Sequence, residues 1–393
     1  MIPAARVQAA IDLLDEVVLS ARDSGPAADT LIARYFKTRR YAGSKDRRAV
    51  RDLVYDAIRR AGERPESGRA AMLGLLQDQP DLAAHFDGSP HGPAAIVEGE
   101  KPTNGRLVPR WIAPLLSDLI DARERTALLA RAPLDVRVNR LKATRDEVAG
   151  MLSDAAVIDS LPDALRLPEG YPLEKSDAWD QGLVEVQDAG SQIIAATCGA
   201  QPGMTVIDLC AGAGGKTLAL AAAMEGQGAL IAADTVRSRL QRLTPRAERA
   251  GAGFIETLLL DQGREGAALG SYEGKADIVL VDAPCSGTGT WRRNPEARWR
   301  LTPDRLTRLT VEQARILDIA APLVRDGGRL VYAVCALTDR EGRNQVDAFL
   351  KRHPGWTAVP VGGAVGRVWG MGQLLTPHHD GTDGFFLAVL EKS

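Results

Sequence analysis

The fold of this chain is decided by residues 205–217, which read TVIDLCAGAGGKT. An apolar strand pattern comes first, and a turn with three glycines joins it to an apolar helical pattern. Glycines at such a turn let a ligand approach the backbone closely, and the N–H groups at the start of the helix remain free to bind it. Because a plain tight turn needs only one glycine, we favour a ligand-binding loop.

The spacing of this loop excludes two phosphate-binding motifs. A P-loop requires glycine at the position of Cys210, and the dinucleotide fingerprint requires glycine at the position of Thr217. Acidic residues at Asp234, Asp261 and Asp282 end the next three expected strands. An acid at the end of the second strand is placed to accept hydrogen bonds from ribose hydroxyls, and the next acid is placed to contact an adenine amine. The pattern therefore indicates a nucleoside without phosphates.

Strand and helix patterns alternate from Asp188 to the end of the sequence. This alternation predicts an α/β fold with a parallel sheet covered on both faces. Such sheets bind ligands at the carboxyl ends of their strands, so we expect the motifs at one edge. The expected strands are Thr205–Leu209, Leu230–Asp234, Leu258–Asp261, Ile278–Asp282, Arg329–Val334 and Phe385–Leu390.

Two cysteines fall at the ends of neighbouring expected strands, Cys285 shortly after Asp282 and Cys335 directly after Val334. A lone cysteine in an apolar strand is usually a small buried hydrophobic residue, but two at one edge favour chemistry. A thiolate that adds to C6 of cytosine makes C5 nucleophilic, which splits one difficult methylation into easier steps. An acid near N3 must neutralise the charge on the ring, and Asp282 can do so if burial keeps it protonated.

Several motifs resemble, in order, those of the RsmB/Sun family of RNA cytosine-C5 methyltransferases, and the resemblance spans most of the chain. It implies a Rossmann-like class I methyltransferase fold with a late antiparallel strand. The motifs are VQDAGSQ at 186–192, DLCAGAGGKT at 208–217, DAPCSGTG at 282–289, YAVC at 332–335 followed by Glu341 and Asn344, and DGFF at 383–386.

The same resemblance implies roles for individual residues. Cys335 is expected to attack C6 of the target cytosine, and Cys285 is expected to assist product release. Asp282, the acid expected near N3, completes the catalytic set independently of the resemblance. The expected cofactor is S-adenosylmethionine. Its expected contacts are Cys210, Ala211, Gly212, Ala213, Gly214, Gly215, Lys216, Asp234, Asp261 and Asp282.

The chain departs from the family pattern in two places. Val334 and Ala336 flank the expected nucleophile, where Thr and Ser are usual, and Gly212-Ala213 stands where Ala-Pro is common. We expect both changes to be tolerated, because the reacting thiol and the backbone of the loop are retained.

The first third of the chain has apolar residues at helical spacing in residues 4–19, 28–35 and 47–60. Residues 34–60 contain ten Lys or Arg and three Asp, which is either a solvated helix face or an RNA-contacting patch. A likeness to NusB-like RNA-binding domains favours the patch. We expect an all-α NusB-like domain at 1–133, a small α+β linking domain at 134–187 and the methyltransferase domain at 188–393.

The linking segment contains one strand pattern and one helix signal. Residues 135–139 alternate like a strand. Thr144 and Glu147 have the capping-box spacing at the start of a helix that runs to Leu152.

Arginines and tryptophans are interleaved in residues 291–300, WRRNPEARWR, after the Cys285 motif. Arginine can pair with phosphate and tryptophan can stack on an unpaired base. We therefore expect RNA contact here, with a loop whose tryptophans pack inward as the alternative. The target cytosine must leave its stack to reach Cys335. The resemblance favours small-subunit ribosomal RNA as the substrate, with transfer RNA as the alternative.

Three other functions remain open at this point. A DNA cytosine methyltransferase would use Cys285 as the nucleophile, although its Glu-Asn-Val motif is absent from the sequence. A non-catalytic RNA-binding factor would bind RNA without methyl transfer, and an NTPase would hydrolyse nucleotides.

Composition limits the possible partners and compartments. The formal net charge of −2 confines any nucleic-acid site to a local patch. Charges within the first 20 residues interrupt a signal-peptide core, and no apolar run is long enough to span a bilayer. The four cysteines and five histidines lack metal-ligand spacing. We expect a cytoplasmic monomer without a metal or a membrane partner.

Overall fold

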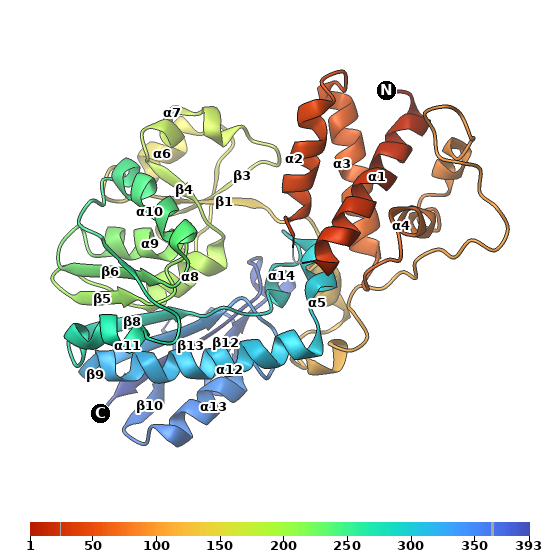
Figure 1. Cartoon of the computed structure of the whole chain (residues 1–393). Helices are drawn as coiled ribbons and strands as arrows, with labels where there is room; N and C mark the ends of the chain where they lie inside the picture. The colour runs from red at the N-terminus through yellow and green to blue at the C-terminus, as the bar shows by residue number, and fades with distance from the viewer. Residues whose placement is uncertain (24, 363–364) are drawn as a thin grey trace. The chain divides into compact units, whose positions relative to one another are not determined.

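The computed structural model describes residues 1–23, 25–362 and 365–393, which form two compact units (Figure 1). The first, which we call the helical unit, combines Met1–Ala130 with Thr290–Arg305. The second, the sheet unit, combines Arg131–Gly289 with Leu306–Ser393. The segment at 134–187, which the sequence suggests as a separate linking domain, clusters with the sheet unit.

The helical unit is built from helices whose apolar faces pack on one another, as their spacing predicts. Leu13 and Leu14 of the first helix and Val54 and Ile58 of the third are fully buried in one apolar core. The helices are α1 (Pro3–Arg22), α2 (Ala28–Thr38), α3 (Ser44–Arg60), α4 (Gly68–Leu75) and α5 (Ala122–Ala127), with short 3-10 helices at Pro80–His85 and Ala113–Leu115.

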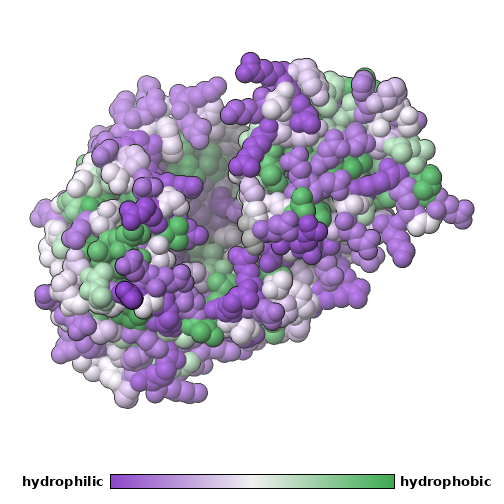
Figure 2. All heavy atoms as spheres, viewed as in Figure 1, coloured by the Kyte–Doolittle hydropathy of each residue, from purple (hydrophilic) through white to green (hydrophobic). Residues whose placement is uncertain are grey.

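Cationic side chains cover the outer surfaces of α2 and α3 and the turn between them. Hydrophilic residues, purple in Figure 2, make up much of the visible surface. Tyr41, in the turn between the two helices, is 73% exposed. The exposed cations of this face are Arg34, Lys37, Arg40, Lys45, Arg47, Arg48 and Arg51.

The Trp-Arg segment is packed into the helical unit, so the expectation that it contacts RNA is wrong. Part of it forms a 3-10 helix at Pro295–Arg300. Arg298 is 1% exposed and donates to carbonyl groups at the end of α3, including that of Ile58. Trp299 Nε1 donates to the oxygen of Ala61 at 2.7 Å, and the indole lies in the apolar core. The guanidinium is buried because the last carbonyls of a helix lack intrahelical partners and accept from cations.

The sheet unit begins with a small antiparallel sheet, four-stranded in the described residues. Its strands are β1 (Leu134–Val138), β2 (Ala156–Val157), β3 (Ala164–Leu167) and β4 (Val184–Val186), in the order β2-β3-β1-β4. Helices α6 (Arg145–Met151) and α7 (Asp177–Asp180) accompany it. The predicted capping box of α6 is confirmed, because Thr144 N donates to Glu147 Oε2 at 2.8 Å and Glu147 N donates to Thr144 Oγ1 at 3.4 Å.

The large sheet has the mixed topology that the resemblance implies. Strands β5 to β9 run parallel, and the late strand β13 pairs antiparallel with β9. Their order is β11-β12-β13-β9-β8-β5-β6-β7, with β10 also paired to β13. The strands are β5 (Thr205–Asp208), β6 (Ala229–Asp234), β7 (Glu256–Leu259), β8 (Ala276–Asp282), β9 (Val324–Val334), β10 (Trp356–Val359), β11 (Arg367–Trp369), β12 (Gly372–Leu375) and β13 (Phe385–Lys392). The predicted Rossmann-like fold is confirmed.

Helices cover both faces of the large sheet, which explains its continuous apolar strands. Figure 1 shows α8, α9 and α10 on one face and α12 and α13 on the other. Val279, Leu280 and Val281 of β8 are therefore all fully buried. The helices are α8 (Ala189–Thr197), α9 (Gly215–Ala223), α10 (Arg237–Ala250), α11 (Glu265–Leu269), α12 (Pro303–Ala320), α13 (Arg343–Arg352) and α14 (Pro377–Asp380).

None of the helices in the described part of the chain combines the length and the apolar composition that crossing a bilayer requires. Among residues 1–23, 25–362 and 365–393, no three His, Cys, Asp or Glu side chains are grouped so as to hold a metal ion.

Candidate active site

Four parallel strands bring most of the predicted site residues to one edge of the large sheet. β5, β6 and β8 end at Asp208, Asp234 and Asp282. β9 ends directly before Cys335. β8 pairs in parallel with both β5 and β9, so these carboxyl ends are neighbours. The structure thus collects the motifs at the edge where the alternating pattern predicts them.

Asp261 does not end its strand as expected. β7 ends at Leu259, where it lies opposite Asp234, the last residue of β6. Asp261 lies two residues further on, is exposed, and its carbonyl oxygen accepts from Arg264 N at 2.8 Å in a turn. The strand stops early because β6, its one partner among the described strands, ends there. Contact between Asp261 and an adenine amine stays a prediction.

The glycine loop between β5 and α9 has a backbone that requires glycine. Gly212 and Gly214 have φ angles of 56° and 85°. A Cβ atom on Gly214 would lie 2.1 Å from Leu243 Cδ1. No side chain caps the start of α9, so the N–H groups of its first turn are available to a ligand.

The Asp234 side chain has a structural role, because it holds the glycine loop through hydrogen bonds. Its Oδ2 accepts from Gly212 N at 2.9 Å, and its Oδ1 accepts from Val236 N at 2.7 Å. A carboxylate offers about four lone-pair positions, so acceptor capacity remains for ribose hydroxyls. The strand-end rule that pointed to Asp234 does not reveal this structural role.

Lys216 and Asp282 form an ion pair across the site, with Nζ 2.6 Å from Oδ2. Burial lowers the pKa of the Lys216 ammonium, but the adjacent carboxylate outweighs burial and the pKa is raised, so Lys216 stays charged. The sequence hypothesis requires a buried Asp282, whereas this side chain is 31% exposed and paired with an ammonium group. The pair places a cation and an anion next to each other at this edge of the sheet.

Asp208 is a buried acid that sequence reasoning did not select. Its Oδ2 accepts from Thr217 Oγ1 at 2.7 Å, which ties the end of β5 to the first turn of α9. Burial raises the pKa of Asp208 to about 7. The sequence does carry a signal, since Asp208 ends the first strand of the sheet as other acids end the later ones.

The two predicted catalytic cysteines are in contact at this edge. Cys285 Sγ and Cys335 Sγ lie 3.1 Å apart, and both side chains are half-buried. The hydrogen bond to Cys335, together with burial, raises the pKa of the Cys285 thiol well above its usual range. The Cys285 thiol therefore keeps its proton at neutral pH, and either sulfur of the pair can be the hydrogen-bond donor.

Glu341 fixes the loop that carries Cys285. Its carboxylate is fully buried and accepts from Ser286 N at 2.7 Å and Gln313 Nε2 at 3.2 Å. Thr338 Oγ1 donates to its other oxygen at 2.8 Å. Glu341 was noticed only through the family resemblance. Gln313, on α12, was missed altogether because a single glutamine in a helix gives no sequence signal.

Two outlying family motifs meet beside the cysteine loop. The Asp188 carboxylate accepts from Asp383 N at 3.0 and 3.1 Å. Gly384 N donates to Gly289 O at 2.8 Å, and a Cβ on Gly289 would lie 1.9 Å from Gly384 O. Only glycine permits this approach, so these motifs support the site through backbone packing.

Hydrogen peroxide is expected to join Cys285 and Cys335 in a disulfide, because their sulfur atoms are in contact. One thiol reduces the peroxide to water and becomes a sulfenic acid, and the other thiol displaces a second water as the S–S bond forms. Mass spectrometry of an unreduced digest should find this cross-link after peroxide and not after dithiothreitol. A cross-link to buried Cys198 instead, or separate alkylation of both site cysteines after peroxide, would contradict the geometry.

Comparison with known proteins identifies relatives along most of the chain. A family model described as 16S rRNA methyltransferase RsmB/F matches residues 195–391. A probable ribosomal RNA small subunit methyltransferase B from Synechocystis sp. is 32% identical over an alignment of 410 residues, covering 88% of this chain and 92% of the relative. Ribosomal RNA small subunit methyltransferase B from Salmonella typhi is 35% identical over 294 residues, covering 73% of this chain and 66% of the relative.

Solved structures share the fold of this chain. The protein in the crystal structure of PH0851 has 25% sequence identity to this chain. Its structure matches with a TM-score of 0.81, covering 100% of this chain and 99% of that one. NSun6 from Pyrococcus horikoshii shares the fold. Its sequence identity is 20% and its TM-score is 0.64, covering 72% of this chain and 96% of that one. The chain belongs to the RsmB/F family of 16S rRNA methyltransferases, which use S-adenosylmethionine as the methyl donor.

Proposed function

We propose that this methyltransferase acts on C5 of a cytosine in 16S rRNA through a covalent bond between Cys335 Sγ and C6 of the base. The observation that carries the proposal is the contact between the sulfur atoms of Cys285 and Cys335, 3.1 Å apart at the edge that carries the glycine loop. Methylation of a nitrogen or an oxygen has no need of a thiol, whereas C5 becomes nucleophilic only after addition at C6.

The cofactor is assigned to the glycine loop, residues 210–216, and to Asp234. The uncapped first turn of α9 supplies N–H donors, and the Asp234 carboxylate supplies acceptors for ribose hydroxyls. Asp261 and Asp282 complete the proposed set. When bound, S-adenosylmethionine supplies the methyl group.

In the first step the Cys335 thiolate forms a bond to C6, and the π electrons of the C5–C6 double bond become available at C5. Negative charge then develops on the ring, and the Lys216 ammonium, which Asp282 orients, stabilises that charge beside N3. Before attack, the Cys285 sulfur lies 3.1 Å from the Cys335 sulfur, and its S–H is placed to donate to the attacking thiolate.

In the second step C5, which has used the π electrons to bond the methyl group as that group's bond to the donor's sulfur broke, loses its proton to a base and then to solvent. The electrons of the C–H bond restore the C5–C6 double bond, and the bond between C6 and the Cys335 sulfur breaks with its electron pair returning to sulfur. The Cys285 S–H stabilises the departing thiolate, which is its proposed role in product release.

RNA contact is assigned to the basic face of α2 and α3. Exposed cations such as Arg34, Lys37 and Arg48 are suited to phosphate groups, and exposed Tyr41 is suited to stacking on an unpaired base. The Trp-Arg segment is excluded from this assignment because Arg298 and Trp299 are buried in the helical unit.

The product nucleoside tests this proposal. Unmodified 16S rRNA and transfer RNA are incubated with the protein and methyl-labelled cofactor, digested to nucleosides and separated by mass spectrometry. We expect the label in 5-methylcytidine from 16S rRNA, at one position found by bisulfite sequencing. Label in any other nucleoside would overturn the C5 assignment, and label only in transfer RNA would overturn the proposed substrate.

A further inference from the structure

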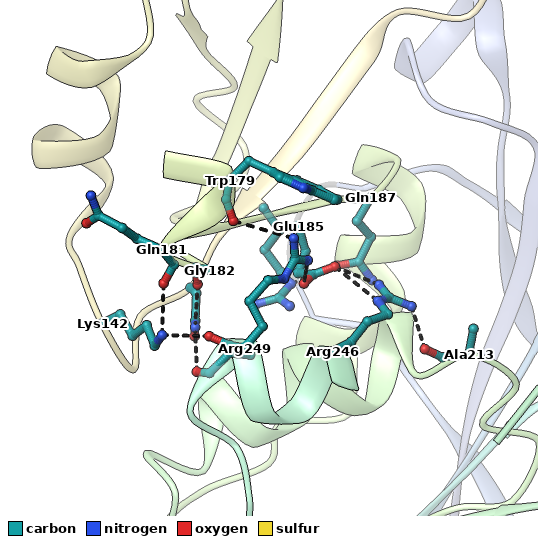
Figure 3. A network of polar contacts seen from close by, with 12 residues as sticks. Lys142, Trp179, Gln181, Gly182, Glu185, Gln187, Ala213, Arg246 and Arg249 are labelled. Carbon is teal, nitrogen blue, oxygen red and sulfur yellow. Dashed lines mark hydrogen bonds and ion pairs between the residues drawn. The ribbon is translucent and has the colours of Figure 1, made fainter. Parts of the chain in front are cut away.

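A series of polar contacts, drawn in Figure 3, joins the small antiparallel sheet to the glycine loop. Arg246, on α10, donates through Nη1 to the carbonyl oxygen of Ala213 in the glycine loop. The same guanidinium donates to Glu185 Oε2 on β4 through Nη2 at 2.7 Å and Nε at 3.2 Å. One side chain thus connects the loop to the small sheet.

Glu185 fixes the orientation of this arginine. Its side chain is only 4% exposed and lies between two guanidinium groups, those of Arg246 and Arg249. Arg249 also covers the ring of Trp179, with its Cζ 3.9 Å from the ring centroid. A buried carboxylate held by two arginines has few alternative geometries, so the donor aimed at the loop is preorganised.

A second contact reaches the loop from the residue that follows β4. Gln187 Nε2 donates to the carbonyl oxygen of Gly215 at 3.2 Å. Its Oε1 accepts from Arg137 Nε on β1 at 2.8 Å, which orients the amide. Two carbonyl groups of the loop therefore accept hydrogen bonds from Arg246 and Gln187, whose side chains are held in place by residues of the small sheet.

We propose that Arg246 and Gln187 are positioning residues for the cofactor, through which the small sheet sets the affinity for S-adenosylmethionine. The loop carries left-handed glycines, Gly212 and Gly214, and its first α9 turn has no side-chain cap. Such a backbone has other accessible conformations in the absence of external contacts. Fixing two of its carbonyl groups keeps its N–H groups aimed at the ligand.

The test is a binding measurement on Arg246→Ala and on Gln187→Ala in the full chain. Calorimetric titration with S-adenosylhomocysteine, the demethylated cofactor, should show affinity reduced about tenfold for Arg246→Ala, and by a smaller factor for Gln187→Ala. Arg246→Lys keeps one donor and should recover part of the loss. Hydrogen exchange of the amides at 210–217 should become faster in both alanine variants.

Lys142→Ala is the matched control. Lys142 Nζ donates to Gln181 O at 2.8 Å and Arg249 O at 2.6 Å, so it joins the small sheet to α10 without touching the loop. The affinity of the Lys142→Ala variant for S-adenosylhomocysteine should stay near that of the unchanged protein, even if the melting temperature of the variant falls. If Arg246→Ala and Gln187→Ala bind as tightly as Lys142→Ala, the two residues are structural only and the proposal is overturned.

The role of Arg246 and Gln187 rests on the proposed binding of the cofactor at the glycine loop, and it does not depend on which atom of the base is methylated. S-adenosylhomocysteine is titrated without RNA, so a product other than 5-methylcytidine would leave the result unchanged. Normal affinity in these variants would in turn leave the covalent mechanism untouched.

Discussion

Replacing Cys335 by alanine is expected to lower the rate of methyl transfer by at least about 10⁴-fold, because the covalent bond to C6 that makes C5 nucleophilic can no longer form. The loss should appear in single-turnover rates measured at saturating cofactor, so that it reports chemistry and not binding. The affinity for S-adenosylhomocysteine should change little, since the glycine loop and Asp234 do not depend on this sulfur for their contacts.

Cys198→Ala is the control for losing a thiol elsewhere in the fold. Cys198 is fully buried at the end of α8, and its Sγ donates to Ile194 O at 3.4 Å. We expect a stability loss of about 1 kcal/mol and nearly normal transfer. The assignment fails if Cys335→Ala still methylates while Cys285→Ala does not, which is the pattern of a DNA-type cytosine methyltransferase.

Asp282→Asn is expected to lower the transfer rate by about 10²–10⁴-fold, because the substitution removes the anion that orients Lys216 beside the base. It also leaves a buried ammonium without its carboxylate. Because Asp282 is 31% exposed, we expect a stability loss of about 2 kcal/mol, below the value for a fully buried pair.

A double variant separates the two effects of this pair. Lys216→Met combined with Asp282→Asn removes both charges, so urea denaturation should show stability recovered relative to Asp282→Asn alone. The transfer rate should not recover. A single Asp282→Asn variant whose rate stays within about threefold of normal would exclude the ion pair from the chemistry.

The sequence was sufficient to predict the part of the fold that depends on local pattern. Alternating apolar strands and helices place β5, β6, β8 and β9 correctly, and the capping box of α6 follows from Thr144 and Glu147. These features depend on residues close together in the chain, where periodicity and capping chemistry are reliable. The edge that collects the cysteines follows from strand direction alone.

Contacts between distant residues could not be predicted in this way. Arg298 donates to Ile58 O, which lies 240 residues away in the sequence. That contact helps to bury a segment whose arginines and tryptophans are typical of an RNA-contacting surface. Glu341 gains its role from Ser286 and Gln313, which lie far away in sequence. Composition and spacing describe what a side chain can do, but only the fold decides which partner it meets.

A denaturing gel of the protein with labelled RNA tests the covalent role of Cys335 most directly. In Cys285→Ala the thiol that helps Cys335 to leave is gone, so the account predicts a protein–RNA band that survives boiling in detergent. In the double variant Cys285→Ala/Cys335→Ala the band should be absent. A band of equal intensity in the double variant would show that another residue bonds to the RNA and would contradict the account.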